Sequence, residues 1–126
     1  MSECCGESRA KTVLLYACSG GANVGEIADR AARQLMAEGA GIMWCLAGLG
    51  GNVDLIVQKA KDADQNIILD GCPVECARKC FENAGVTNYV HIKITDLGID
   101  KAKGVAITED QVAAAVAKAK DVLSDT

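Results

Sequence analysis

The sequence predicts an α/β fold with three layers, in which a four-stranded parallel sheet carries helices on both faces. Short apolar runs alternate with segments of helical periodicity, which is typical of strand-helix units joined by right-handed crossovers. Half of the residues are hydrophobic but only 3% are aromatic, so small aliphatic side chains must form the core. A length of 126 residues suits one domain, which we place at 11–126 behind a flexible segment at 1–10.

The first strand-helix unit begins with an apolar run at 12–17, which predicts a buried strand that ends just before Cys18. Asn23 and Glu26 have the spacing of a capping box at the start of the following helix. Gly39 is expected to stop this helix, because glycine is the usual residue just past a helix C-terminus.

The second unit is expected to have a strand at 42–47, which contains Cys45 near its end. A glycine-rich turn at 48–51 follows, and Asn52 is the predicted cap of the next helix. The two elements therefore repeat the order of the first unit.

The third unit has a predicted strand at 66–71, and Cys72 follows it directly. Pro73 favours the first position of a helix, so Cys72 is the predicted N-cap of a helix that runs through Phe81 and stops near Gly85.

The fourth strand, predicted at 89–95, alternates more strongly than the others, as expected of an edge strand. A loop at 97–107 then precedes a last helix, for which Thr108 and Gln111 form a capping box. The loop is longer than most such connections and is interpreted either as a lid or as a plain surface loop. The result is a Rossmann-like sheet, whose strands all end at the edge where ligands bind.

Composition excludes several classes of function. The net charge of −4 comes with interspersed charges and few aromatic residues, which argues against nucleic acid as a partner. We find neither a leader pattern nor an apolar run long enough for a membrane helix, so we expect a cytoplasmic protein. Seven cysteines in that compartment favour metal binding or thiol chemistry over disulfides.

Three of the cysteines, Cys18, Cys45 and Cys72, are predicted at the carboxyl edge of the sheet. On a continuous helix Cys76 would lie one turn beyond Cys72, about 6 Å away, which is close enough to share an ion. Cys80 would lie about 12 Å along the axis from Cys72, too far for the sulfur spacing of about 3.8 Å that tetrahedral zinc needs. We therefore exclude Cys80 from the expected ligands.

The sequence says less about the other residues considered for the site and about the acidity of the individual thiols. A helix N-terminus favours the thiolate, so Cys72 is expected to be the most acidic thiol. The single histidine, His91, falls inside a strand and is expected to be structural, whereas Asp70 is a nearer polar neighbour of the site. Cys4 and Cys5 lie in the terminal segment, either as part of a floppy end or as a thiol pair that visits the site. The glycine turns match neither of the nucleotide-binding motifs G-x-G-x-x-G and G-x-x-x-x-G-K-[ST].

Three short motifs resemble the DGC-domain family, a set of proteins proposed to bind zinc and named for an Asp-Gly-Cys motif. The motifs are Tyr-Ala-Cys-Ser-Gly at 16–20, Cys-Leu-Ala-Gly-Leu-Gly-Gly at 45–51 and Leu-Asp-Gly-Cys-Pro-Val-Glu-Cys-Ala at 69–77, with a looser match at 95–98. The resemblance implies that the four characteristic cysteines are Cys18, Cys45, Cys72 and Cys76, and that zinc is their ligand.

Three functional hypotheses follow. The first is a zinc-binding protein whose four thiolates hold the ion, as a structural element or a docking module for a protein partner. The second is a thiol enzyme or sulfur carrier in which Cys72 is the nucleophile and another site cysteine resolves the product. The third is an iron-sulfur cluster or another soft-metal site, because thiolate ligation alone does not separate iron from zinc.

Overall fold

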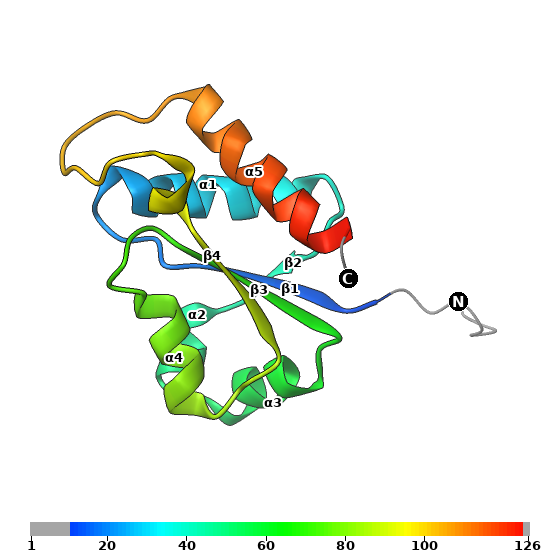
Figure 1. Cartoon of the computed structure of the whole chain (residues 1–126). Helices are drawn as coiled ribbons and strands as arrows, with labels where there is room; N and C mark the ends of the chain where they lie inside the picture. Colours follow the sequence, from blue (N-terminus) through cyan, green and yellow to red (C-terminus); the bar gives the residue numbers. More distant parts are fainter. Residues whose placement is uncertain (1–10, 125–126) are drawn as a thin grey trace.

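The computed structural model describes residues 11–124, which form a sheet of four parallel strands in the order β2-β1-β3-β4 (Figure 1). The strands are β1 (Val13–Ala17), β2 (Ile42–Met43), β3 (Gln65–Asp70) and β4 (Tyr89–Lys93). The predicted parallel sheet is therefore confirmed, with β4 at an edge as its alternating pattern indicated.

Helices cover both faces of the sheet, which confirms the three-layer arrangement (Figure 1). One face carries α1 (Asn23–Ala37) and α5 (Glu109–Ser124), and the short 3-10 helix η1 (Ile94–Leu97) follows β4. The other face carries α2 (Leu46–Gly50), α3 (Asp54–Asp62) and α4 (Cys76–Ala84).

Alternate residues of the central strands supply two cores. Leu15 and Ile67 point into the core under α1 and α5, whereas Leu14 and Ile68 point into the core under α2, α3 and α4. All four are at most 1% exposed, because a parallel sheet with helices on both faces buries every side chain of its central strands. This explains why these strands read as continuous apolar runs.

The second unit differs from the prediction. The strand predicted at 42–47 pairs with β1 only at Ile42 and Met43, and the glycine-rich segment forms the short helix α2 instead of a turn. A Cβ at Gly48 would lie 2.8 Å from Ile56, and one at Gly50 would lie 3.0 Å from the Cys80 sulfur. These glycines therefore allow α2 to pack closely against α3 and α4.

Two of the predicted helix caps are also wrong. The cap of α1 is Ala22, because the Asn23 side chain is engaged with a distant loop, and the cap of α3 is Val53 instead of Asn52. The capping box of Thr108 and Gln111 is confirmed, with reciprocal backbone-to-side-chain bonds of 3.0 and 3.1 Å.

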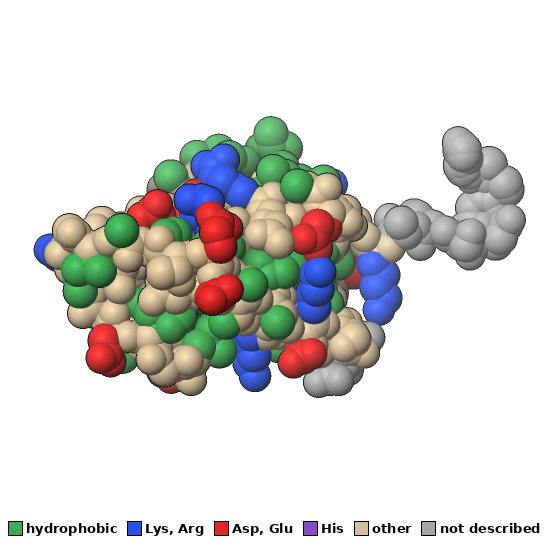
Figure 2. Space-filling model, turned by 90° about the horizontal axis from the view of Figure 1, so that it is seen from above, with side chains coloured by type: hydrophobic (Ala, Val, Ile, Leu, Met, Phe, Trp, Pro, Cys, Tyr) green, Lys and Arg blue, Asp and Glu red, His purple; other side chains and the backbone are tan. Residues whose placement is uncertain are grey.

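The strand predicted at 89–95 ends at Lys93, where η1 begins. No helix within residues 11–124 has the length and apolarity needed to span a bilayer. Acidic and basic side chains are interspersed on the face seen in Figure 2, as the sequence suggested. The segment predicted to be flexible at 1–10, with Cys4 and Cys5, lies outside the described residues.

Candidate functional site: a thiol pocket at the switch point of the sheet

The strand order reverses between β1 and β3, which are neighbours in the sheet. The chain leaves β1 toward α1 on one face and leaves β3 toward α4 on the other (Figure 1). Loops that depart in opposite directions open a crevice at the carboxyl ends of the strands, where ligands bind in folds of this type. Cys18 follows β1 and Cys72 follows β3, so the fold brings both to this crevice.

The crevice holds a pocket of about 210 Å³, which we call the thiol pocket. Three cysteines, two lysines, four glycines and three apolar residues line it: Cys18, Cys72, Cys76, Lys101, Lys103, Gly20, Gly21, Gly25, Gly71, Ala22, Val24 and Val74. Cys45 is exposed beside α2 and is not among these lining residues. The structure thus brings together three of the four predicted site cysteines at one pocket.

Cys18 is bound directly to the Asp-Gly-Cys turn. Its backbone N–H donates to the carbonyl of Leu69 at 3.1 Å, which extends the pairing of β1 with β3 by one residue. Its sulfur accepts from the backbone N–H of Gly71 at 3.3 Å. Burial raises the pKa of the Cys18 thiol, although the bonds to the amides of Gly20 and Gly71 act in the opposite direction. In this arrangement the thiol form of Cys18 is favoured.

Gly71 is required by the close approach of the turn to α1. A Cβ at this position would lie 2.9 Å from the backbone nitrogen of Gly25 and 2.9 Å from the carbonyl carbon of Val24. Backbone atoms cannot move aside as the end of a flexible side chain can, so only glycine fits here.

Asp70 anchors the N-terminus of α4. Its carboxylate, 1% exposed, accepts from the backbone N–H groups of Ala77 at 2.8 Å and Arg78 at 3.1 Å. The same carboxylate lies 2.7 Å from Nε2 of His91 on β4. Two unpaired amides at the helix start thus find an acceptor seven and eight residues upstream in the sequence. His91 contacts Asp70 and is not among the residues that line the thiol pocket.

The helix start itself corrects the prediction for Cys72. α4 begins at Cys76, and its N-cap is Glu75 in the left-handed conformation, with φ of 59°. Cys72 belongs to the preceding turn, so it does not cap a helix and does not lie on one helix with Cys76. The prediction that Cys72 and Cys76 lie on adjacent turns of one helix is therefore wrong. Cys72 is also not at a helix N-terminus, which was the reason to expect it to be the most acidic thiol.

Glu75 holds the turn from its other side. Its carboxylate accepts from Arg78 Nε at 2.7 Å and from Lys93 Nζ at 3.2 Å. The bond to Arg78 above all, and the bond to Lys93, keep the pKa of Glu75 below its ordinary value. This ion-pair network and Asp70 together tie the start of α4 to β4.

Cys80 lies one turn into α4 from Cys76 and faces α2 instead of the thiol pocket. It packs in the core under α2, α3 and α4, and burial raises the pKa of its thiol, with smaller contributions from Cys76 and Asp70. Cys80 is absent from the lining of the thiol pocket.

The loop at 97–107 supplies two basic side chains that sequence reasoning missed. Lys101 Nζ lies 3.4 Å from the Cys72 sulfur, and Lys103 also lines the thiol pocket. Apart from the unusual length of the loop, no sequence signal pointed to these lysines. Because its ammonium group directly contacts a site cysteine, Lys101 is a functional candidate.

Asn23 joins this loop to the start of α1 by hydrogen bonds. Its Nδ2 donates to the carbonyl of Asp100 at 2.9 Å, and its Oδ1 accepts from the N–H of Ala102 at 2.7 Å. Its own backbone N–H donates to the carbonyl of Ala102 at 2.9 Å, and an isolated bridge pairs Ala22 with Lys103. The side chain expected to cap a helix instead holds the lysines over the thiol pocket.

The donor set of the site suits a soft metal ion, since thiolates are preferred ligands of zinc and iron. The geometry of the described residues is more open, because within 11–124 no group of three or more His, Cys, Asp and Glu side chains is placed to hold an ion together. Metal binding would therefore need the cysteines to approach one another.

Comparison with known proteins identifies the family. The family model described as "DGC domain" matches residues 14–119. The chain is similar to the "Anaerobic and virulence modulator AnvM" of Pseudomonas aeruginosa, with 36% identity over 91 residues, which cover 72% of this chain and 70% of that protein. No solved structure matches significantly. The match over most of the chain, including the Asp-Gly-Cys turn that joins β3 to the thiol pocket, means that this protein belongs to the DGC-domain family.

Proposed function

We propose that the protein binds a soft metal ion, zinc foremost, through Cys18, Cys72 and Cys76, with Cys45 as the fourth thiolate. The observation that carries this proposal is the convergence of the first three cysteines on one pocket at the switch point of the sheet. Thiolates are the form that ligates metals, and a divalent ion offsets their mutual repulsion.

The surrounding charges also favour this function. Four thiolates and one divalent ion carry a net charge of −2, and the ammonium groups of Lys101 and Lys103 line the same pocket. These two lysines would offset the charge of the loaded site. The same lysines would be poor neighbours for a site built to bind a bare cation through carboxylates.

Metal binding requires a local rearrangement, because the thiols are not yet arranged around a common point. The turn at 72–74 lies outside α4, and Pro73 and Val74 within it are exposed. This turn can therefore move without unfolding the helix that Asp70 and Glu75 hold. Cys45 is exposed at the start of α2, from which its side chain would close the site.

The test is metal analysis of protein purified without added metal and without air, combined with titration of the free thiols. We expect about one zinc per chain, as a single tetrahedral thiolate site would hold. Cys72→Ser and Cys76→Ser should each lose the metal, whereas Cys80→Ser should retain it as the matched control. Metal-free protein, or equal loss in all three variants, would overturn the proposal, and a brown protein absorbing visible light would indicate iron in place of zinc.

A second function is favoured by the contact of 3.4 Å between Lys101 Nζ and the Cys72 sulfur. In this function Cys72 is a nucleophile that attacks a disulfide sulfur, forms a mixed disulfide and releases the other sulfur as a thiolate. Cys18 or Cys76, on the same pocket, would then attack the mixed disulfide and free the bound group.

Trapping of the mixed disulfide separates the two functions. In metal-free protein, Cys72 should attack a small aromatic disulfide first, which forms a mixed disulfide at Cys72 and releases one aromatic thiolate from the reagent, before any reaction at Cys80. If Cys72 reacts no faster than Cys80, the nucleophile hypothesis fails. The relative AnvM is named a modulator, and a modulating role would suit a protein whose metal-loaded or oxidised form is recognised by a partner protein.

A further inference from the structure

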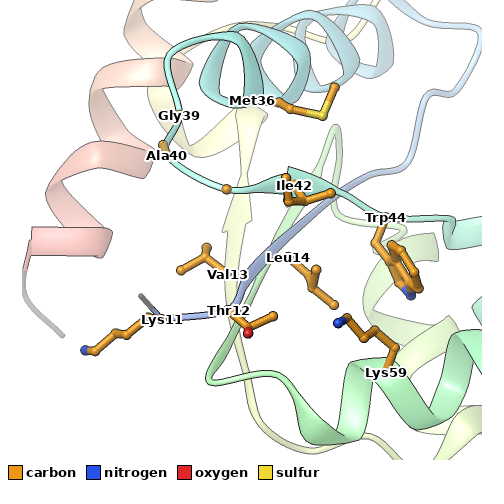
Figure 3. A pocket seen from close by; sticks show the side chains of 11 residues that line it. Lys11, Thr12, Val13, Leu14, Met36, Gly39, Ala40, Ile42, Trp44 and Lys59 are labelled. Carbon is orange, nitrogen blue, oxygen red and sulfur yellow. The ribbon is translucent and has the colours of Figure 1, made fainter. Parts of the chain in front are cut away.

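A second pocket has a volume of about 550 Å³, and Figure 3 shows the side chains that line it. It opens beside the amino-terminal ends of β1 and β2. The thiol pocket lies at the other, carboxyl-terminal end of the strands. We call the second pocket the β2 groove and define it by six of its lining residues: Lys11, Leu14, Met36, Ile42, Trp44 and Lys59. Its position beside an edge strand distinguishes it from an ordinary surface depression.

The backbone edge of β2 is open on this side. Within residues 11–124, β2 pairs with β1 alone, and the N–H of Trp44 points inward to the carbonyl of Leu15 at 2.8 Å. Since backbone groups alternate along a strand, the N–H of Met43 points outward. Its acceptor is the thioether sulfur of Met36, at 3.3 Å. A thioether is a weak acceptor on a flexible side chain, so a peptide carbonyl would make a stronger bond in its place.

The side chains of the β2 groove are apolar along the strand. Ile42 is 56% exposed and Met36 is 38% exposed, although both are large hydrophobic residues. The half-buried ring of Trp44 is held by a bond of 3.2 Å from its Nε1 to the carbonyl of Ile56. An open strand edge flanked by exposed apolar side chains is the surface to which an added strand binds.

The positive charges of the β2 groove favour a partner with acidic side chains. Among the described residues that line the groove, Lys11 and Lys59 are basic and none is acidic, and Lys59 extends from α3 toward Leu14 and Trp44 (Figure 3). Neither lysine forms a salt bridge with another residue in the described range 11–124. A second copy of this chain, docked through the same edge, would bring two more lysines into the groove. An acidic segment of a different protein complements these charges.

We propose that the β2 groove binds an extended peptide segment of a partner protein as an added strand beside β2, and that this peptide carries acidic and apolar side chains on the face that it turns toward α3. The peptide backbone replaces the Met36 sulfur as the partner of the Met43 N–H. Apolar side chains of the peptide pack on Ile42 and Trp44, and its carboxylates pair with Lys59 and Lys11. Strand addition supplies affinity through the backbone and specificity through alternate side chains.

The experiment is selection of a displayed library of random octapeptides on the full chain. The expected result is enrichment of peptides that place aspartate or glutamate two residues from an aliphatic residue, so that both side chains share one face of the strand. The best peptide is then synthesised and titrated, with the fluorescence of Trp44, the single tryptophan of the chain, as the readout. No enrichment, or enrichment of basic peptides, would overturn the proposal.

Variants on both partners test the geometry. Lys59→Glu should weaken binding about five-fold, the effect of reversing one exposed charge, whereas Lys61→Glu on the same helix, outside the groove, should not. Two peptides N-methylated at alternate positions should differ, because only one set of N–H groups faces β2. Equal affinity of both methylated peptides would refute strand addition, and self-association that competes with the peptide would instead assign the edge to a second copy.

Discussion

Replacing Asp70 by asparagine tests how the Asp-Gly-Cys turn is held. The carboxylate is 1% exposed and accepts from the amides of Ala77 and Arg78, and it also contacts His91 Nε2. An asparagine keeps one acceptor oxygen but presents an NH2 group to at least one of these donors. Hydrogen bonds to a charged group contribute about 1.5–3 kcal/mol each, so we expect Asp70→Asn to lower the free energy of unfolding by about 2–4 kcal/mol.

Urea denaturation followed by circular dichroism measures this loss, which should move the midpoint by about 1–2 M urea. Asp96→Asn in η1 is the matched control, because Asp96 is exposed and its variant should change stability by less than about 0.5 kcal/mol. The Cys76 thiol should also react faster with an alkylating agent once the start of α4 is loosened. A change in unfolding free energy below about 0.5 kcal/mol for Asp70→Asn would refute the anchoring role assigned to this carboxylate.

Three further predictions concern other residues of the sheet and the thiol pocket. Gly71→Ala should destabilise the protein by about 2 kcal/mol in the same urea assay, because its Cβ would overlap the backbone of α1; a neutral effect would contradict that close approach. Burial raises the pKa of Tyr16 above its ordinary 10.0, so its contribution to stability is complete below pH 10 and is lost as the pH rises further; Tyr16→Phe should flatten this alkaline decline in thermal melts, and an unchanged slope would exclude Tyr16 as its source. Lys101→Met should slow alkylation of Cys72 by iodoacetamide in metal-free protein at pH 7 by about three- to ten-fold, because it removes the ammonium group that contacts the Cys72 sulfur; an unchanged rate would mean that this contact does not affect the reactivity of Cys72.

The predictions also separate folding from function. Asp70 and Gly71 act on the position of the turn, so their variants should alter stability whether or not a metal is bound. Lys101 is exposed on the loop and acts only through its charge, so its variant should leave stability nearly unchanged. If Lys101→Met instead destabilised the chain, the loop would have a structural role that the Asn23 contacts alone do not explain.

The architecture follows from local patterns in the sequence. Buried strands of a parallel sheet need apolar residues on both faces, so β1 and β3 stand out as short continuous runs, and β4 stands out by its alternation. Because all strands run in one direction, the strand ends alone predict that Cys18 and Cys72 meet at the same edge. The capping box at Thr108 is equally local, and it too is confirmed.

The tertiary structure decided the features that depend on contacts between distant residues. Pro73 favours a helix start, yet α4 begins only at Cys76, where the Asp70 carboxylate accepts its first free amides. Asn23 is a good capping residue by type, but the loop carbonyl and amide 77 and 79 residues away bind its side chain instead. Hydrogen bonds between residues so far apart in the sequence produce no periodic pattern from which they could be predicted.

The cysteine site shows the same division. The strand ends predict Cys18, Cys45 and Cys72 at the carboxyl edge of the sheet, whereas Cys76 is predicted there by a helical spacing that the structure does not have. The sequence does not reveal that three of them share a pocket with Lys101 and Lys103, since a loop has no period that fixes where its side chains point. Local patterns in the sequence thus determine the fold and place cysteines at the carboxyl edge of the sheet. The two lysines come to lie beside those thiols only through the contact of Asn23 with the loop, which is a tertiary contact.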